Sequence, residues 1–161
     1  KSACLAQLVN VIGPIMTETG GPAWRQTIFH PFAQASRHGH GNVLRTKVET
    51  DSFSAGGVGD APLLVTSVIE DPVTGDATIF ALNRSLDESL SIEALVRGFD
   101  GLTVRESHQL RNDDLMAVNR KGTPDTIKPA PLEGVEIWGE QVRAKLAPAS
   151  WNVIRLEVQK Q

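Results

Sequence analysis

The apolar positions of the first seventeen residues predict a short helix followed by a buried strand. Residues 2–10 carry four apolar side chains at helical spacing, Cys4, Leu5, Leu8 and Val9. Ser2 is available as an N-cap of this helix. Residues 11–17, VIGPIMT, are short, rich in β-formers and apolar on both faces. This is typical of a strand of a parallel sheet or barrel, whose faces are both covered, although Pro14 weakens the prediction at its centre.

A loop and a second helix follow in the pattern. Residues 18–22, ETGGP, are loop-forming by composition. A helix is then predicted by residues that recur at a spacing of three or four, namely Phe29, Phe32, Ala33 and Ser36. Pro31 is tolerated in its first turn, and Gly39 ends it. The order helix, strand, loop, helix is one α–β–α step of a repeating α/β architecture.

From residue 42 the period of the pattern changes to two. Alternation or short apolar runs predict strands at 44–48, 63–69, 78–83, 90–94, 102–110, 142–146 and 154–158. The segment 71–75, DPVTG, predicts a turn between two of them. Seven or eight short strands separated by Gly, Pro, Asn and Asp clusters predict an antiparallel β-sandwich over residues 42–161.

Two longer loops interrupt the predicted strands. Residues 51–62 form the first, and residues 112–131, rich in Pro, Lys and Asp, form the second. The second loop, because of its length and composition, is expected to be mobile.

Charge is distributed unevenly along the chain. Residues 1–41 contain one acidic residue, Glu18, against three basic ones, whereas residues 42–161 contain 18 acidic and 13 basic residues. The first part therefore has the composition of a segment buried against a surface that this sequence does not supply. A net charge of −3 without a basic stripe argues against nucleic acid as a partner.

The single cysteine, Cys4, excludes an intrachain disulfide and fits a reducing compartment, or an oxidising one where no staple is needed. Its apolar neighbours predict a buried structural thiol. The apolar runs stop short of the roughly 18 residues that a membrane span needs, so no membrane contact is expected. No charged segment and cleavage pattern follows Lys1, so no signal peptide is expected.

One long stretch, LVNVIGPIMTETGGPAWRQTIFHPFAQASRHGHG at residues 8–41, resembles the last barrel strand and last barrel helix of glycoside hydrolase family 51, the α-L-arabinofuranosidases. VTSVIEDPVTGDATIFALNRSLDESLSIE and the closing SWNVIRLEV resemble that family's C-terminal sandwich. The resemblance covers nearly the whole chain and is weakest in residues 51–62 and 111–139. It implies a mainly β fold, with a jelly-roll-like sandwich at residues 42–161 preceded, at residues 1–41, by the last α–β–α step of a (β/α)8 barrel.

The resemblance also implies an activity. Family members remove terminal α-L-arabinofuranosyl units with retention of configuration, using one glutamate as acid/base and another as nucleophile. Such carboxyls lie about 5–5.5 Å apart, so that one attacks the anomeric carbon while the other protonates the leaving oxygen. In the family both glutamates lie upstream of the matched region, so no catalytic residue is expected in this chain.

The resemblance carries over one binding residue and suggests a second. The family places a glutamine, in a Trp-Arg-Gln motif after the last barrel strand, within hydrogen-bonding reach of arabinose; here the motif is Trp24-Arg25-Gln26, and Gln26 is the predicted substrate-binding residue. An amide offers both donor and acceptor to sugar hydroxyls, and barrel enzymes build sites at the carboxyl ends of strands. Trp24 either offers an apolar face to the sugar or packs the barrel rim. Arg25 is expected to pair with a structural carboxylate.

Other candidates for chemistry are weaker. Glu18 is expected to be a solvated loop residue rather than a catalytic carboxylate. His30, His38 and His40 lack acidic or cysteine partners at ligand spacing, so no metal site is expected. The family needs no metal, and no cofactor is expected.

Three further patterns are judged structural or left open. The glycine-rich residues 54–59 precede no helix and do not form a phosphate loop. Residues 111–114, RNDD, lack EF-hand spacing and are expected to be exposed. Trp151 is expected to pack in the core, whereas Trp138 is open to either packing or sugar stacking.

Two classes of function remain. The first is the C-terminal part of an intracellular, cytoplasmic arabinofuranosidase acting on arabinoxylan, arabinan or arabino-oligosaccharides. Its partners would be the barrel portion of the same enzyme, an arabinofuranosyl saccharide and further subunits, since family members are commonly oligomers, often hexamers. The second is a non-catalytic carbohydrate-binding or assembly module. The apolar residues 4–32 favour the first, because a free-standing sandwich has no use for a strand buried on both faces.

Overall fold

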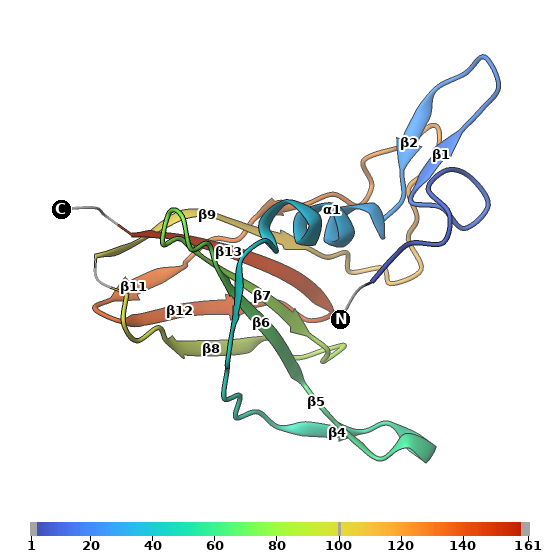
Figure 1. Cartoon of the computed structure of the whole chain (residues 1–161). Coiled ribbons are helices and arrows are strands. Elements are labelled where there is room, and N and C mark those ends of the chain that lie inside the picture. The colour runs from blue at the N-terminus through green and yellow to red at the C-terminus, as the bar shows by residue number, and fades with distance from the viewer. Residues whose placement is uncertain (1–2, 100, 159–161) are drawn as a thin grey trace.

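The computed structural model describes residues 3–99 and 101–158, and most of its regular structure is β (Figure 1). A small hairpin of β1 (Ile15–Thr17) and β2 (Ala23–Arg25) projects beyond one end of the molecule. The helix α1 (Phe29–His38) follows it and leads into two facing sheets. Within these described ranges, no helix is long and apolar enough to cross a membrane.

The larger sheet has six strands in the order β10-β9-β13-β7-β6-β3, and every pairing in it is antiparallel. Its strands are β3 (Asn42–Leu44), β6 (Leu64–Glu70), β7 (Ala77–Asn83), β9 (Leu102–Leu110), β10 (Ala130–Pro131) and β13 (Ser150–Val158). The turn predicted between β6 and β7 is confirmed. Asp71 Oδ1 accepts a hydrogen bond from the backbone N–H of Val73, and Gly75 adopts a φ of 80°.

The smaller sheet has three antiparallel strands in the order β11-β12-β8: β8 (Leu90–Leu95), β11 (Glu136–Trp138) and β12 (Gln141–Leu146). Alternate residues of both sheets point between them, as the period-two pattern predicts. The resulting core contains Ile79, Val142, Leu146, Ile154 and Leu156, all at most 3% exposed. The predicted antiparallel sandwich is confirmed.

The outer face of the larger sheet carries α1, which begins and ends where the sequence predicts (Figure 1). Here Phe80 and Trp151 stack with ring centroids 5.6 Å apart, beside Ile69 and Val153. Trp151 Nε1 donates to Gln34 Oε1 of the helix at 2.8 Å. The prediction that Trp151 packs rather than binds sugar is therefore confirmed, because its ring is held between strand and helix.

The first predicted loop contains regular structure. Between residues 51 and 63 lie β4 (Ser52–Ser54), the 3₁₀ turn η1 (Gly56–Val58) and β5 (Asp60–Pro62), which form a hairpin extending away from the sandwich (Figure 1). Conversely, the strand predicted over residues 44–48 ends at Leu44. Pairing with β6 covers only Asn42–Leu44, and without a partner the alternation beyond it does not form a strand.

The predictions for residues 2–17 are mostly wrong in this structure. Ser2 lies outside the described residues, and residues 3–10 are not helical. Asn10 and Val11 adopt positive φ angles of 60° and 50°, which end any extended run before β1. The β1 strand covers only the last three residues of the predicted strand and pairs antiparallel with β2, so it is not a strand covered on both faces.

Cys4 is also exposed rather than buried. The physical reason is the same as for the missing helix and strand. Short helices and single strands are marginal without tertiary packing, and every residue from 3 to 12 except Asn10 is exposed.

Candidate functional site

The β1–β2 hairpin places the Trp-Arg-Gln motif at the edge of the molecule. Trp24 lies opposite Met16 in the hairpin register. Gln26 follows directly, and its backbone N–H donates to Pro14 O at 2.8 Å while its carbonyl accepts from Phe29 N–H at 3.0 Å. The motif is thus tied to the hairpin on one side and to the start of α1 on the other. Both Trp24 and Gln26 are half-buried.

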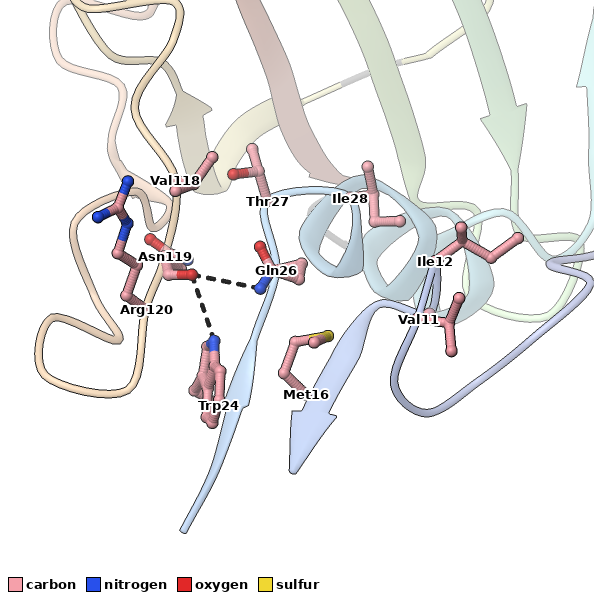
Figure 2. Close-up of a pocket in the computed structure, with 11 residues that line it drawn as sticks. Val11, Ile12, Met16, Trp24, Gln26, Thr27, Ile28, Val118, Asn119 and Arg120 are labelled. Carbon is pink, nitrogen blue, oxygen red and sulfur yellow. Dashed lines mark hydrogen bonds between the residues drawn. The ribbon is translucent and has the colours of Figure 1, made fainter. Parts of the chain in front are cut away.

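A loop of the sandwich closes over these two side chains. The connection between β9 and β10 brings Asn119 to the hairpin, and its backbone carbonyl accepts two hydrogen bonds (Figure 2). Trp24 Nε1 donates one at 3.2 Å, and Gln26 Nε2 donates the other at 3.2 Å. The structure therefore brings the two sequence-predicted residues together on one acceptor more than 90 residues downstream.

The side chain of Asn119 holds this loop in place. It is 2% exposed. Its Nδ2 donates to the carbonyls of Arg25 and Ile127 at 2.9 and 2.8 Å, and its Oδ1 accepts from Ile127 N–H at 2.7 Å. A salt bridge of 2.7 Å between Lys121 and Glu18 joins the same loop to the hairpin at the surface. Buried amides with these bonds made are costly to remove, because each lost bond leaves a polar group unsatisfied.

These elements surround an open hollow of about 590 Å³ (Figure 2). Its lining is mostly apolar, and its polar groups include an indole, a side-chain amide and a guanidinium. The lining residues include Val11, Ile12, Met16, Trp24, Gln26, Val118, Asn119 and Arg120. Apolar walls with a few convergent polar groups suit a ligand that has both C–H faces and hydroxyls, as sugars do. No carboxylate lines the hollow within the described residues, so these groups can bind and orient a ligand but supply no acid, base or nucleophile.

The expected pairing of Arg25 with a carboxylate is not observed. Its guanidinium carbon lies 5.0 Å from the centroid of the Phe29 ring, and no acidic side chain within residues 3–99 and 101–158 makes a salt bridge with it. The planar guanidinium stacks on an aromatic face instead. Burial, together with the charge of Arg25, lowers the pKa of His30 below its ordinary value.

The remaining candidates behave as structural or surface groups. Glu18 is an exposed residue engaged with Lys121, as expected of a loop carboxylate. Arg111 pairs with Asp113 at the surface. Trp138 is 69% exposed on β11. Across the described parts of the chain, no group of three or more His, Cys, Asp or Glu side chains is placed to hold a metal ion.

Comparison with known proteins decides the family. Residues 1–150 match the family model described as the α-L-arabinofuranosidase C-terminal domain. The chain is 44% identical over 154 residues to an intracellular exo-α-(1→5)-L-arabinofuranosidase of Streptomyces lividans, with 95% of this chain and 23% of the relative covered. The chain belongs to the α-L-arabinofuranosidases of glycoside hydrolase family 51.

Other family 51 proteins agree in sequence and structure. An intracellular exo-α-(1→5)-L-arabinofuranosidase 1 of Bacillus subtilis (strain 168) is 37% identical over 159 residues, with 99% of this chain and 31% of the relative covered. The solved structure of a family 51 α-L-arabinofuranosidase from Bifidobacterium longum superimposes with a TM-score of 0.88 at 31% identity, over 94% of this chain and 30% of that one. This chain thus spans less than a third of the length of these family 51 arabinofuranosidases.

The sequence predicted Trp24 and Gln26 but missed Asn119. Asn119 lies inside residues 112–131, which composition marks as a mobile loop, and a single Asn there resembles any turn residue. Its role depends on a contact across 94 residues, for which the local pattern carries no signal.

Proposed function

We propose that this chain is the C-terminal part of a retaining, exo-acting α-L-arabinofuranosidase that removes terminal, non-reducing α-L-arabinofuranosyl residues. Residues 1–41 would complete its (β/α)8 barrel, and residues 42–161 would form the sandwich that braces it. Family membership and the names of the relatives support the activity. The observation that carries the site is the amide of Gln26 at the edge of a mostly apolar hollow.

The chemistry would be shared between this chain and the barrel portion. The barrel portion would contribute both glutamates, of which one attacks the anomeric carbon and the other protonates the leaving oxygen. This chain would contribute Gln26, whose amide hydrogen-bonds hydroxyls of the arabinofuranosyl unit, and Trp24, whose indole forms the wall beside it. Such bonds hold the sugar in the position from which attack occurs.

The wider context is proposed on the same basis. The relatives are named intracellular, which supports a cytoplasmic location. Arabinoxylan, arabinan and arabino-oligosaccharides are the proposed sources of the terminal unit. A homo-oligomer, with a hexamer as the state common in the family, is the proposed assembly, and light scattering of the full-length protein would test it.

Activity of the full-length protein tests the proposal directly. We expect hydrolysis of an aryl α-L-arabinofuranoside with retention, and we expect Gln26→Ala to lower kcat/KM about tenfold or more, the cost of at least one hydrogen bond to the sugar. Gln141→Ala is the matched control, because this amide lies on the outer face of the smaller sheet and bonds to Glu93, away from the hollow.

Each outcome has a meaning. An inactive full-length protein whose sandwich still binds arabinofuranosyl saccharides would favour the non-catalytic module instead. An active protein in which Gln26→Ala matches Gln141→Ala would leave the activity but remove Gln26 from the site.

A further inference from the structure

The β9–β10 connection reaches from the sandwich to the substrate-binding residues of the hairpin. We propose that Asn119 on this connection is a positioning residue of the arabinofuranosyl site. It acts through Gln26 and Trp24 and does not contact the sugar through its side chain. This inference rests on the proposed function and adds a role for the sandwich in it.

The first step concerns the carbonyl of Asn119. A carbonyl oxygen has two lone pairs and cannot donate. Here both positions are used, by Trp24 Nε1 and by Gln26 Nε2. Only the NH₂ end of the Gln26 amide can face this oxygen, because the opposite orientation would set two carbonyl oxygens against each other. The amide orientation of Gln26 is therefore fixed by its partner.

The second step concerns what this orientation leaves free. With Nε2 turned to Asn119, Gln26 Oε1 has no hydrogen-bond partner among residues 3–99 and 101–158. It is consequently an acceptor available for a hydroxyl at the hollow (Figure 2). A sugar hydroxyl that donates to Oε1 is selected over a group that can only accept, because the latter would leave Oε1 unpaired.

The third step concerns what holds the carbonyl in place. The Asn119 side chain is almost fully buried and bonds to Arg25 O on the hairpin and to both backbone groups of Ile127 on the loop. These three bonds set the distance between the sandwich loop and the Trp-Arg-Gln motif. Without them the carbonyl is free to move, and the amide of Gln26 loses the partner that orients it.

A double-mutant cycle in the full-length protein tests the inference. We expect Asn119→Ala to lower kcat/KM about tenfold, close to the effect of Gln26→Ala. In the Gln26→Ala background, Asn119→Ala should lower kcat/KM only slightly further, because the residue through which Asn119 acts is absent. Fully multiplicative losses would overturn the proposal, as would a normal kcat/KM for Asn119→Ala.

A matched control separates positioning from stability. Asn152→Ala removes an equally buried asparagine that bonds to Ala81, Ser150 and Gln109 inside the sandwich. We expect it to lower the midpoint of thermal unfolding as Asn119→Ala does. It should leave kcat/KM nearly unchanged, because none of its partners lines the hollow. An equal kinetic loss in both variants would overturn the proposal, because stability alone would then explain the effect.

A second variant covers the case in which Asn119→Ala does not fold. Asn119→Ser introduces no charge and keeps a hydroxyl that can bond to one of the three backbone groups but not to all of them, and it should show the same coupling to Gln26. The proposed function fails separately: an inactive wild type, or an active one that Gln26→Ala does not affect, removes the site itself. An active enzyme sensitive at Gln26 and insensitive at Asn119 removes only this inference.

Discussion

Asparagine occupies the largest almost fully buried polar positions of the described chain, Asn83, Asn119 and Asn152. Each joins backbone segments that are distant in the sequence. Asn83 donates to the carbonyls of Leu146 and Ala147, which ties the end of β7 to the turn after β12. The amide of an asparagine both donates and accepts, so one side chain can hydrogen-bond the backbone N–H and C=O groups of another segment without a strand pairing between the two. The positions of these three side chains are therefore specified by bonds between segments that are distant in the sequence.

A second residue-scale feature is a charged cluster between α1 and the larger sheet. Arg155 Nη1 on β13 lies 2.5 Å from Glu106 Oε1 on β9, and His108 Nε2 lies 3.1 Å from Glu106 Oε2. The hydrogen bond from Arg155 lowers the pKa of the Glu106 carboxyl, with His108 acting in the same direction. Burial and then the charge of Arg155 lower the pKa of His38 at the end of α1, against the opposing charge of Glu106.

This cluster predicts that stability falls as the pH is lowered. Both pKa values are lower in the folded state, so the unfolded chain binds more protons and the free energy of unfolding decreases with falling pH. The loss begins below 6.5, the ordinary value of His38, and grows below 4.5, that of Glu106. Thermal unfolding of the full-length protein from pH 8 to 4 measures it. His38→Gln should reduce the first part, to which His30 also contributes, and Glu106→Gln should reduce the second, to which Asp71 also contributes. Unchanged profiles in both variants would contradict the assignment.

At the scale of elements, the passage from α1 to β3 is short and takes only residues 39–41. Gly39 N–H closes the helix on Ala35 O at 2.8 Å, and three residues later β3 pairs with β6. Gly41 between them has a φ of 127°, and a Cβ there would lie 2.0 Å from Glu70 O. The helix can therefore reach the sheet edge only through a residue without a side chain.

We accordingly expect Gly41→Ala to lower the free energy of unfolding by about 2 kcal/mol or more, through strain and the clash with β6. Gly57→Ala is the matched control, because its added methyl meets no atom within 4 Å and its φ is not in the left-handed region. That change should stay within about 0.5 kcal/mol. Equal midpoints of urea unfolding for the two variants would contradict the role given to Gly41.

The elements differ in how well the sequence predicts them. The longer strands of the sandwich and α1 were predicted because their alternation or 3–4 spacing indicates faces that are covered within the chain itself. The short strands β10 and β11 were not predicted, since two or three residues carry too little alternation to indicate a strand. The prediction for residues 2–17 failed because helix and strand there depend on contacts that the chain does not make with itself. In the site, a family motif indicated Gln26, whereas Asn119 depends on a fold-level contact that no local pattern records.

At the scale of the whole molecule, an apolar surface runs along the amino-terminal segment and the start of α1. It is formed by Leu8, Val11, Ile12, Ile28 and Phe32, with Val11 81% exposed and Ile12 69% exposed. Val11, Ile12 and Ile28 lie together along the hollow, and exposed apolar side chains gathered in this way mark a surface that another part of a protein covers. The proposed barrel portion is the natural cover.

This surface predicts opposite effects of one change in two contexts. Val11→Ser combined with Ile12→Ser should raise the solubility of the isolated chain, yet lower the free energy of unfolding of the full-length protein by about 2 kcal/mol or more, since buried apolar groups are lost only there. Val73→Ser, 84% exposed at the β6–β7 turn, is the control and should change neither. A full-length protein unaffected by the double change would show that the barrel portion does not cover this surface.

The place of β13 has a consequence for how the protein is made. This strand follows all the others in the sequence, yet it lies between β9 and β7 in the larger sheet. While the ribosome is still translating residues before Ser150, the β3-β6-β7 and β9-β10 groups have no strand to join them and each presents an open edge. The larger sheet can close only after β13 itself has been made and has left the ribosome, and chaperones that shield open edges would act on nascent chains that still lack this strand.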